Sequence, residues 1–114
     1  MISKRGAMQT ELKENMRGGT GTIAITHLVD KDQIKNGRLM ARIDIPVGAS
    51  LGQHRHEGET EYYLIQEGDG EVNESNGTAM VGPGDVVITG DGESHSIANI
   101  GRVPLIMTAV IIFD

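Results

Sequence analysis

The side chains best suited to metal binding or catalysis lie in the segment GQHRHEGETE, where one residue separates two histidines and carboxylates follow. Side chains two positions apart on an extended chain point to the same side, so His54 and His56 can converge on one ion. A turn after His56 would bring the chain back and allow Glu61 to add an oxygen. A third imidazole would complete a strong site, and His27 and His95 are the candidates. Without such a partner, the same segment is also typical of a polar surface loop.

The composition limits both the ligands and the partners. The chain contains no cysteine, which excludes disulfides, thiolate metal sites and thiol nucleophiles and leaves histidine and carboxylate as the strong metal ligands. The 16 acidic residues outnumber the 10 lysines and arginines, and the net charge of -6 opposes binding to nucleic acid or to anionic membranes. We therefore expect a small-molecule ligand, with no nucleic acid and no membrane as partner.

Residues 1–19 are expected to form an N-terminal segment outside the main domain, which is expected to comprise residues 20–114. The N-terminal segment contains no long apolar run, so neither an export signal nor a membrane span is expected, and the sequence predicts a cytoplasmic protein. Apolar residues recur at intervals of four within residues 7–16, which predicts one or two helical turns that end at Gly18-Gly19. We expect this segment to be helical or extended and to dock on the main domain or on a partner subunit.

From Thr20 onward the apolar residues alternate with a period of two, which is the pattern of half-buried strands. Short strands separated by turns rich in Gly, Asn, Asp and Pro, with no helical segments between them, predict an antiparallel sandwich or barrel. Only 3% of the residues are aromatic, so aliphatic side chains must fill the core. The expected strands cover residues 22–29, 38–45, 50–56, 61–67, 70–75, 77–82, 85–90, 94–99 and 103–113.

The last expected strand, residues 103–113, is apolar on both faces. Leu105 and Met107 belong to one face, and Ile106 and Val110 belong to the other. One face is expected to line the interior of the barrel, while the other meets a second sheet or subunit. We therefore expect a homodimer.

Two motifs, in order along the chain, join the opening segment to a third histidine. They read Gly48-X5-His54-X-His56-X4-Glu61-X6-Gly68 and Gly84-DVVITGDGES-His95-SIA-Asn99. Together they resemble the first and second motifs of the cupin superfamily, and the chain looks like a small, single-domain cupin. One departure is Gly90, where the family usually has proline, and this difference bears on the rigidity of the turn before His95.

The resemblance implies an all-β fold, the double-stranded β-helix or jelly-roll barrel. It also implies that His54, His56, Glu61 and His95 hold one divalent transition metal per chain inside the barrel. Three neutral imidazoles and one carboxylate suit Mn, Fe, Co, Ni, Cu or Zn, whereas Mg and Ca prefer more oxygen ligands. Four protein ligands in an octahedral arrangement would leave two positions for water, substrate or dioxygen. His27 is expected to be a core or rim histidine with one hydrogen bond instead.

Other polar residues near the motifs are candidates for further roles. Glu59 lies on the turn beside the implied ligands, where it is either a solvated charge or a catalytic general base or lid carboxylate. Tyr63 shares the parity of Glu61 and should point inward, where its hydroxyl faces a substrate in a catalytic role or only packs with a hydrogen-bond partner. Arg42 and Arg55 could neutralise an anionic substrate, although Arg55 alternates away from the histidines.

Three functions are compatible with these observations. The resemblance implies first a metal-dependent enzyme that acts on a small organic acid or related metabolite, of decarboxylase, dioxygenase or isomerase type. The alternative is a non-catalytic cupin with a structural metal that binds or senses a small molecule. The third is a purely structural barrel in which the metal ties strands together. Open coordination positions and a nearby acid such as Glu59 favour the enzyme.

Overall fold

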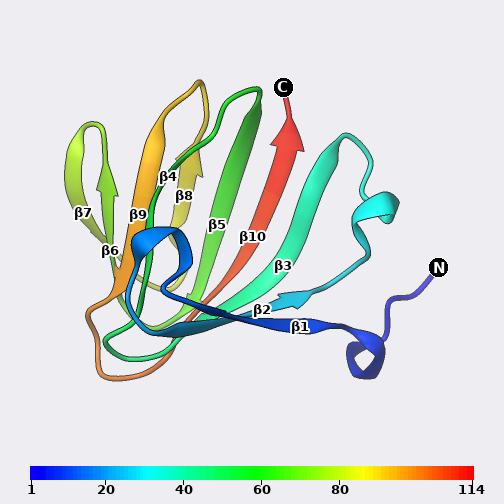
Figure 1. Ribbon diagram of the computed structural model, residues 1–114, viewed down its shortest axis with the longest axis horizontal. Coiled ribbons are helices and arrows are strands. Elements are labelled where there is room, and N and C mark those ends of the chain that lie inside the picture. The colour runs from blue at the N-terminus through cyan, green and yellow to red at the C-terminus, as the bar shows by residue number, and fades with distance from the viewer.

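The computed structural model describes residues 1–114 and consists of two antiparallel β-sheets that enclose one core (Figure 1). The larger sheet has six strands in the order β1-β2-β3-β10-β5-β8, and the smaller has four in the order β4-β9-β6-β7. From β3 onward the chain crosses repeatedly between the sheets, as in a jelly-roll barrel. The strands are β1 (Thr10–Glu14), β2 (Thr22–His27), β3 (Gly37–Ile45), β4 (Ser50–Arg55), β5 (Glu59–Glu67), β6 (Gly70–Glu74), β7 (Gly77–Val81), β8 (Val86–Thr89), β9 (Ser94–Asn99) and β10 (Leu105–Phe113).

The core lies between the sheets and follows the predicted alternation of apolar residues. On β10, Leu105, Met107, Ala109 and Ile111 are buried, while the residues between them are only partly covered. The same alternation holds on β5 and β9. Aliphatic side chains dominate the core, and Tyr63 is its one aromatic residue. The prediction of an all-β jelly-roll barrel is therefore confirmed.

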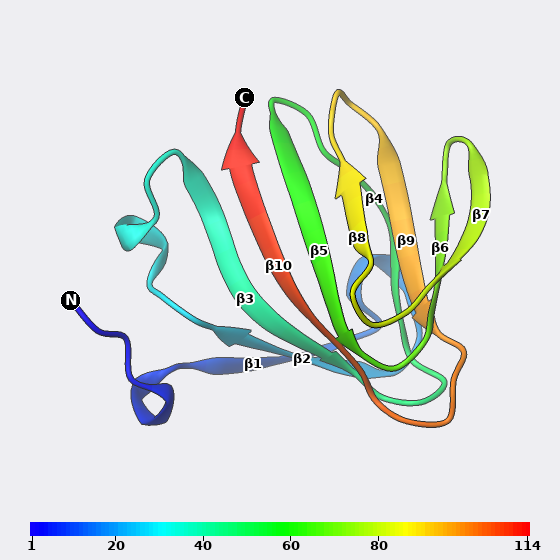
Figure 2. The same cartoon turned by 180° about the vertical axis from the view of Figure 1, so that it is seen from behind.

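The N-terminal segment is extended, and the helix predicted over residues 7–16 was wrong. Residues 10–14 form β1, which pairs with β2 in an antiparallel register that joins Glu11 to Ile25. All five residues of β1 are exposed, and Leu12 is 71% exposed, so the interval of four does not mark a buried helix face. Hydrogen bonds to β2 stabilise this segment, whereas a short isolated helix is marginal in water. Figure 2 shows β1 and β2 running together below the other strands.

Helical structure is limited to three single 3-10 turns, η1 (Arg5–Ala7), η2 (Met16–Gly18) and η3 (Lys31–Gln33). No helix of the structure is long and apolar enough to cross a lipid bilayer.

Candidate metal centre

Four side chains from both sheets meet inside the barrel. His54 lies on β4, His56 follows directly after it, Glu61 lies on β5 and His95 lies on β9. His54 and His95 are direct partners across the β4–β9 pair, and Glu61 faces them from the larger sheet. One ligand atom from each residue lies within 4.8 Å of the others. The structure thus groups the four residues that the cupin motifs imply, and His27 is not among them.

The atoms that converge are three imidazole nitrogens and one carboxylate oxygen. Oε1 of Glu61 lies 2.9 Å from Nε2 of His56, 3.0 Å from Nε2 of His95 and 3.6 Å from Nε2 of His54. Nε2 of His95 lies 2.9 Å from Nε2 of His54 and 3.2 Å from Nε2 of His56. All four atoms therefore surround the same small volume.

Contacts at the outer nitrogen of each ring fix its orientation. Nδ1 of His54 lies 2.8 Å from the carbonyl oxygen of Gly52, and Nδ1 of His56 lies 2.6 Å from Oε2 of Glu59. Both partners can only accept hydrogen bonds, so in the neutral ring Nδ1 carries the proton and Nε2 presents a lone pair. Nδ1 of His95 lies 2.8 Å from Oγ1 of Thr89. Such outer contacts are typical of histidines that bind metals.

This donor set fits a divalent transition metal. Lone pairs that face one another at about 3 Å repel unless a cation or shared protons lie between them. A mixed set of imidazole nitrogens and one carboxylate oxygen suits Mn, Fe, Co, Ni, Cu and Zn better than Mg or Ca. The four residues could therefore hold such an ion.

The charge states of the group also suit a metal. Burial alone would raise the pKa of Glu61, but its contacts with His54, His56 and His95 lower that pKa far below its usual range, so the carboxylate is ionised. Burial lowers the pKa of His95 and keeps this ring neutral. The hydrogen bond to Glu61 raises the pKa of His56 instead. Protonation of His56 and metal binding at its Nε2 therefore compete with each other.

Glu59 lies behind His56. Arg38 donates two hydrogen bonds to its carboxylate, of 2.6 and 2.7 Å, and His56 donates a third of 2.6 Å. These partners, Arg38 foremost, lower the pKa of Glu59 from 4.5 to about 2. A carboxylate with so low a pKa is a weak base at neutral pH, and its oxygens are already engaged. Its geometry therefore favours the orientation of His56 over proton transfer.

Tyr63 points inward, as its parity with Glu61 suggests. Its ring stacks on the imidazole of His95 with centroids 4.8 Å apart, and its hydroxyl lies 3.3 Å from Nε2 of His95. Burial raises the pKa of this phenol well above its ordinary value, so the hydroxyl remains protonated. Tyr63 also lines the cavity next to the four residues and can donate a hydrogen bond there.

Gly90 is accommodated by its neighbours. A Cβ at this position would lie 2.6 Å from Oγ1 of Thr60, so the structure leaves no room for a larger residue unless Thr60 moves. The turn is held by the backbone instead, because Gly92 N–H donates to the His56 carbonyl and His56 N–H donates to the Glu93 carbonyl, at 2.9 and 3.0 Å. These two hydrogen bonds fix the turn before His95 to one of the candidate ligands.

A cavity of about 170 Å³ is lined by three of the four residues, His54, His56 and Glu61. Its lining includes three cations that the sequence interpretation did not single out, Lys13, Arg17 and Arg38. Lys13 and Arg17 were missed because their segment was predicted to be helical; recognition of β1 would have placed Lys13 on the inward face opposite Ile23. Arg42 and Arg55, which were considered, pair with Asp44 and Glu57 and are exposed.

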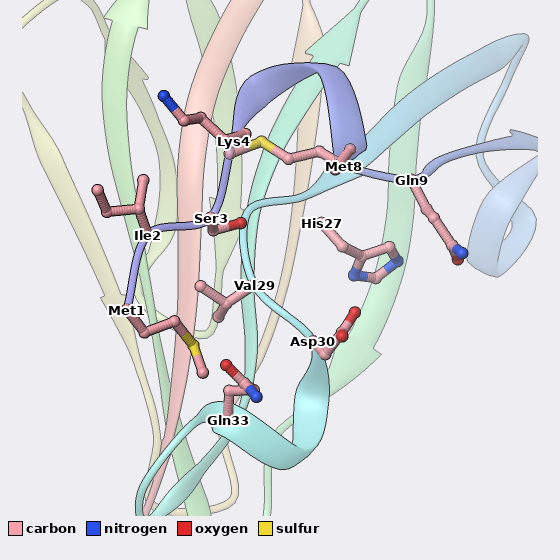
Figure 3. Close-up of a pocket in the computed structure, with 11 residues that line it drawn as sticks. Met1, Ile2, Ser3, Lys4, Met8, Gln9, His27, Val29, Asp30 and Gln33 are labelled. Atoms are coloured by element: carbon pink, nitrogen blue, oxygen red, sulfur yellow. The ribbon is translucent and has the colours of Figure 1, made fainter.

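His27 separates this cavity from a second one of about 380 Å³ near the N-terminus (Figure 3). The second cavity lies between the N-terminal residues and the segment that leads into η3, and none of the four candidate ligands lines it. Nε2 of His27 lies 2.6 Å from Oε2 of Glu11, and this is the only side-chain hydrogen bond that His27 makes. His27 was expected to be a core or rim histidine with one hydrogen bond; it makes one, and its side chain, 33% exposed, lies at the rim.

Known proteins share both the sequence and the fold. The chain is 42% identical over 113 residues to a protein of Thermotoga maritima described as an oxalate-binding protein, and the match covers 98% of this chain and 93% of the relative. A crystal structure of a predicted oxalate decarboxylase from Thermotoga maritima is 40% identical and covers 100% of both chains, with a TM-score of 0.94. A sugar phosphate isomerase from the cupin superfamily, from Silicibacter pomeroyi, shares the fold at 15% identity, with a TM-score of 0.78 and coverage of 100% of this chain and 76% of that chain.

The family assignment rests on the barrel strands that carry the site. Residues 41–111 match the family described as the cupin domain, and this range includes all four candidate ligands. The two-sheet topology and the related structures agree with this match. The chain therefore belongs to the cupin family.

Proposed function

We propose that this cupin binds a small dicarboxylate such as oxalate at a divalent transition metal held by His54, His56, Glu61 and His95. The observation that carries the proposal is the convergence of the lone pairs of these residues beside a cavity whose lining includes cationic side chains. The relative that is 42% identical is described as an oxalate-binding protein. A dicarboxylate fits this combination because it can approach the metal and the cations together.

The bound metal would supply positive charge and free coordination positions for the anion. The protein residues determine the rest of the site: His54 and His56 are oriented by Gly52 and Glu59, and Tyr63 offers a hydroxyl donor. One ion per chain is expected, and Mn, Fe, Co, Ni, Cu and Zn all match the donor set.

The size of the cavity supports a ligand of few atoms. Its volume of about 170 Å³ is well below the roughly 300–1,000 Å³ of sites for drug-sized molecules. Apolar side chains of Leu39, Ile43 and Leu51 line part of it, and apolar surroundings strengthen electrostatic contacts with an anion.

A metal-dependent enzyme of decarboxylase, dioxygenase or isomerase type is the second candidate. The observation in its favour is the Tyr63 hydroxyl, which stays protonated and lies 3.3 Å from Nε2 of His95. The three hydrogen bonds and the low pKa of Glu59 argue against a role of this residue as general base. Formation of carbon dioxide and formate from oxalate by the metal-loaded protein, or of carbon dioxide and hydrogen peroxide from oxalate and dioxygen, would establish turnover.

We expect the protein to form a homodimer through the outer face of the larger sheet. Met40, Val110, Tyr62 and Ile88 lie side by side in one row across β3, β10, β5 and β8. None of them is fully buried, and Ile88 is 62% exposed. A second copy related by a two-fold axis could cover this apolar row with its own.

Two measurements test the metal-dependent binding. Protein purified without a tag should contain about one transition-metal ion per chain by elemental analysis, and His54→Ala or His95→Ala should lose most of it, because each removes one of four ligands. The matched control is His27→Ala, which removes a cavity histidine outside the group and should retain the metal. Stoichiometric metal in both ligand variants would refute the site.

Isothermal titration calorimetry then tests the ligand. Metal-loaded protein should bind oxalate, and the protein after chelation and dialysis should bind it at least tenfold more weakly, because the lone pairs of the site repel an anion in the absence of a cation. Equal affinity before and after chelation would exclude a metal-dependent mode of binding.

A further inference from the structure

The three cations that line the metal-site cavity differ in their partners. Nζ of Lys13 lies 3.9 Å from a carboxylate oxygen of Glu11, and Arg38 is bound to Glu59 through two hydrogen bonds. Arg17 makes no ion pair and no side-chain hydrogen bond. Arg17 is therefore the cation in the cavity lining that is left to bind an anion.

The backbone at Arg17 has an unusual conformation. Arg17 has φ 56° and ψ 30°, in the left-handed region that residues other than glycine rarely adopt. Asn15, two residues earlier, is also left-handed. Such conformations persist where the surrounding structure stabilises them, and they are concentrated at functional sites.

Hydrogen bonds within the turn hold this conformation. Asn15 N–H donates to the carbonyl of Gly21 at 2.9 Å, and Gly18 N–H donates to the carbonyl of Asn15 at 3.0 Å. Gly19 N–H donates to the carbonyl of Met16, also at 2.9 Å. The turn that carries Arg17 is therefore fixed by its own backbone.

The same turn is packed against the strand that carries His54. A Cβ at Gly52 would collide with the carbonyl oxygen of Arg17, so only glycine permits the turn to approach β4 this closely. The segment after the turn is also tied to β4, because Ser50 N–H donates to the carbonyl of Thr20 at 2.8 Å. The backbone of Arg17 is thus fixed against Gly52, whose carbonyl accepts the hydrogen bond from His54.

We propose that Arg17 binds the end of the ligand that lies away from the metal and makes the site selective for dicarboxylates over monocarboxylates. The inference rests on the proposed function, since it assumes that the metal takes one end of the same ligand. A guanidinium group matches a carboxylate through two parallel hydrogen bonds, which a lysine cannot reproduce. Arg17 has no other partner, and its backbone is fixed relative to His54.

The test compares variants of Arg17 in the metal-loaded protein. Arg17→Gly removes the guanidinium and suits the left-handed backbone, so the fold and the metal content should be unchanged. Arg17→Lys keeps the charge without the planar donor pair. Arg102→Gln is the matched control, because Arg102 is an exposed residue in the turn before β10 and also makes no ion pair.

Calorimetric titration with oxalate and with glyoxylate, which has one carboxylate on the same two-carbon skeleton, gives the readout. Arg17→Gly should bind oxalate about 10-fold to 100-fold more weakly than the wild type, while its affinity for glyoxylate changes less than about threefold. Arg17→Lys should fall between the wild type and Arg17→Gly, and Arg102→Gln should match the wild type. Metal content should be the same in all four proteins. The melting temperature should also be the same, except that it can be higher in Arg17→Gly.

Several results would overturn the assignment. Oxalate binding within threefold of the wild type in Arg17→Gly, or an equal loss for oxalate and glyoxylate, would show that Arg17 does not select dicarboxylates. Loss of metal from Arg17→Gly would assign the turn a purely structural role. If metal-loaded wild-type protein does not bind oxalate, both proposals fail. If oxalate binds equally with and without metal and Arg17→Gly still weakens it, the metal-dependent function fails together with the placement of one carboxylate on the metal, and only the contact between Arg17 and the ligand stands.

Discussion

Replacement of Glu59 by glutamine keeps the shape of the side chain but removes the charge that Arg38 and His56 contact. Glu59 is 8% exposed and accepts three hydrogen bonds from these two residues. Glutamine can accept fewer of them and carries no charge to offset the Arg38 guanidinium. We therefore expect the metal-free Glu59→Gln variant to be less stable than the wild type, and its His56 ring to be less firmly oriented.

The pKa of Glu59 gives the magnitude and the pH dependence. The difference between the ordinary value of 4.5 and about 2 corresponds to about 3 kcal/mol of folding free energy at pH 7, at roughly 1.4 kcal/mol per tenfold change in acidity. Because the pKa in the folded state is the lower one, this stabilisation is present above about pH 4.5 and is lost as the pH falls through about 2. Near pH 3 it should amount to about 1 kcal/mol.

Urea unfolding of the metal-free proteins, followed by circular dichroism at pH 7, 5 and 3, measures this difference. Glu57→Gln is the matched control: Glu57 and its partner Arg55 are exposed, so its loss should cost less than about 1 kcal/mol. In the metal-loaded state, Glu59→Gln should bind metal about 10-fold to 100-fold more weakly, and Glu57→Gln should not. A difference between wild type and Glu59→Gln below about 0.5 kcal/mol at pH 7, or one that does not shrink at pH 3, would refute the reasoning.

Three further predictions concern the fold, the turn before His95 and the assembly. Chelation should leave the barrel folded, because a core of 15 buried residues does not depend on the ion; a chelated protein that melts near room temperature would contradict this. Gly90→Ala should destabilise the protein by about 1–3 kcal/mol in urea, because its Cβ would meet Thr60, and in a Thr60→Ala background the cost should fall by at least half. Equal costs in the two backgrounds would show that Thr60 is not the obstacle. Size-exclusion chromatography with light scattering should give a dimer at micromolar concentration and a monomer for Val110→Lys, and a wild-type monomer would remove the proposed interface.

The prediction of the barrel from sequence succeeded because its signal is local. Alternation along a strand decides which side chains face the core, and this held clearly on β5, β9 and β10, whereas β7 has no buried residue. The group of four residues was also identified from the sequence, although only the second motif decided between His27 and His95. Parity placed His54 and His56 on one side, but parity does not show which distant strand lies opposite.

The N-terminal segment and the environment of Glu59 were decided by tertiary structure. The residues of β1 suit a short helix about as well as a strand, and pairing with β2 selects the strand and brings Lys13 to the cavity. The register of β3 against β10 shifts between Gly37 and Leu39, which places a bulge at Arg38. From this bulge the Arg38 side chain donates a hydrogen bond to Glu59.

The sequence by itself therefore determined the alternation that builds the barrel and the motifs that carry its four candidate ligands. The tertiary structure decided which groups surround them: Arg38 behind Glu59, and Arg17 at the cavity. The physical reason is that inward and outward orientation follows from neighbouring residues, whereas contacts between strands far apart in sequence depend on register, on bulges and on close approaches such as that of the Arg17 carbonyl to Gly52.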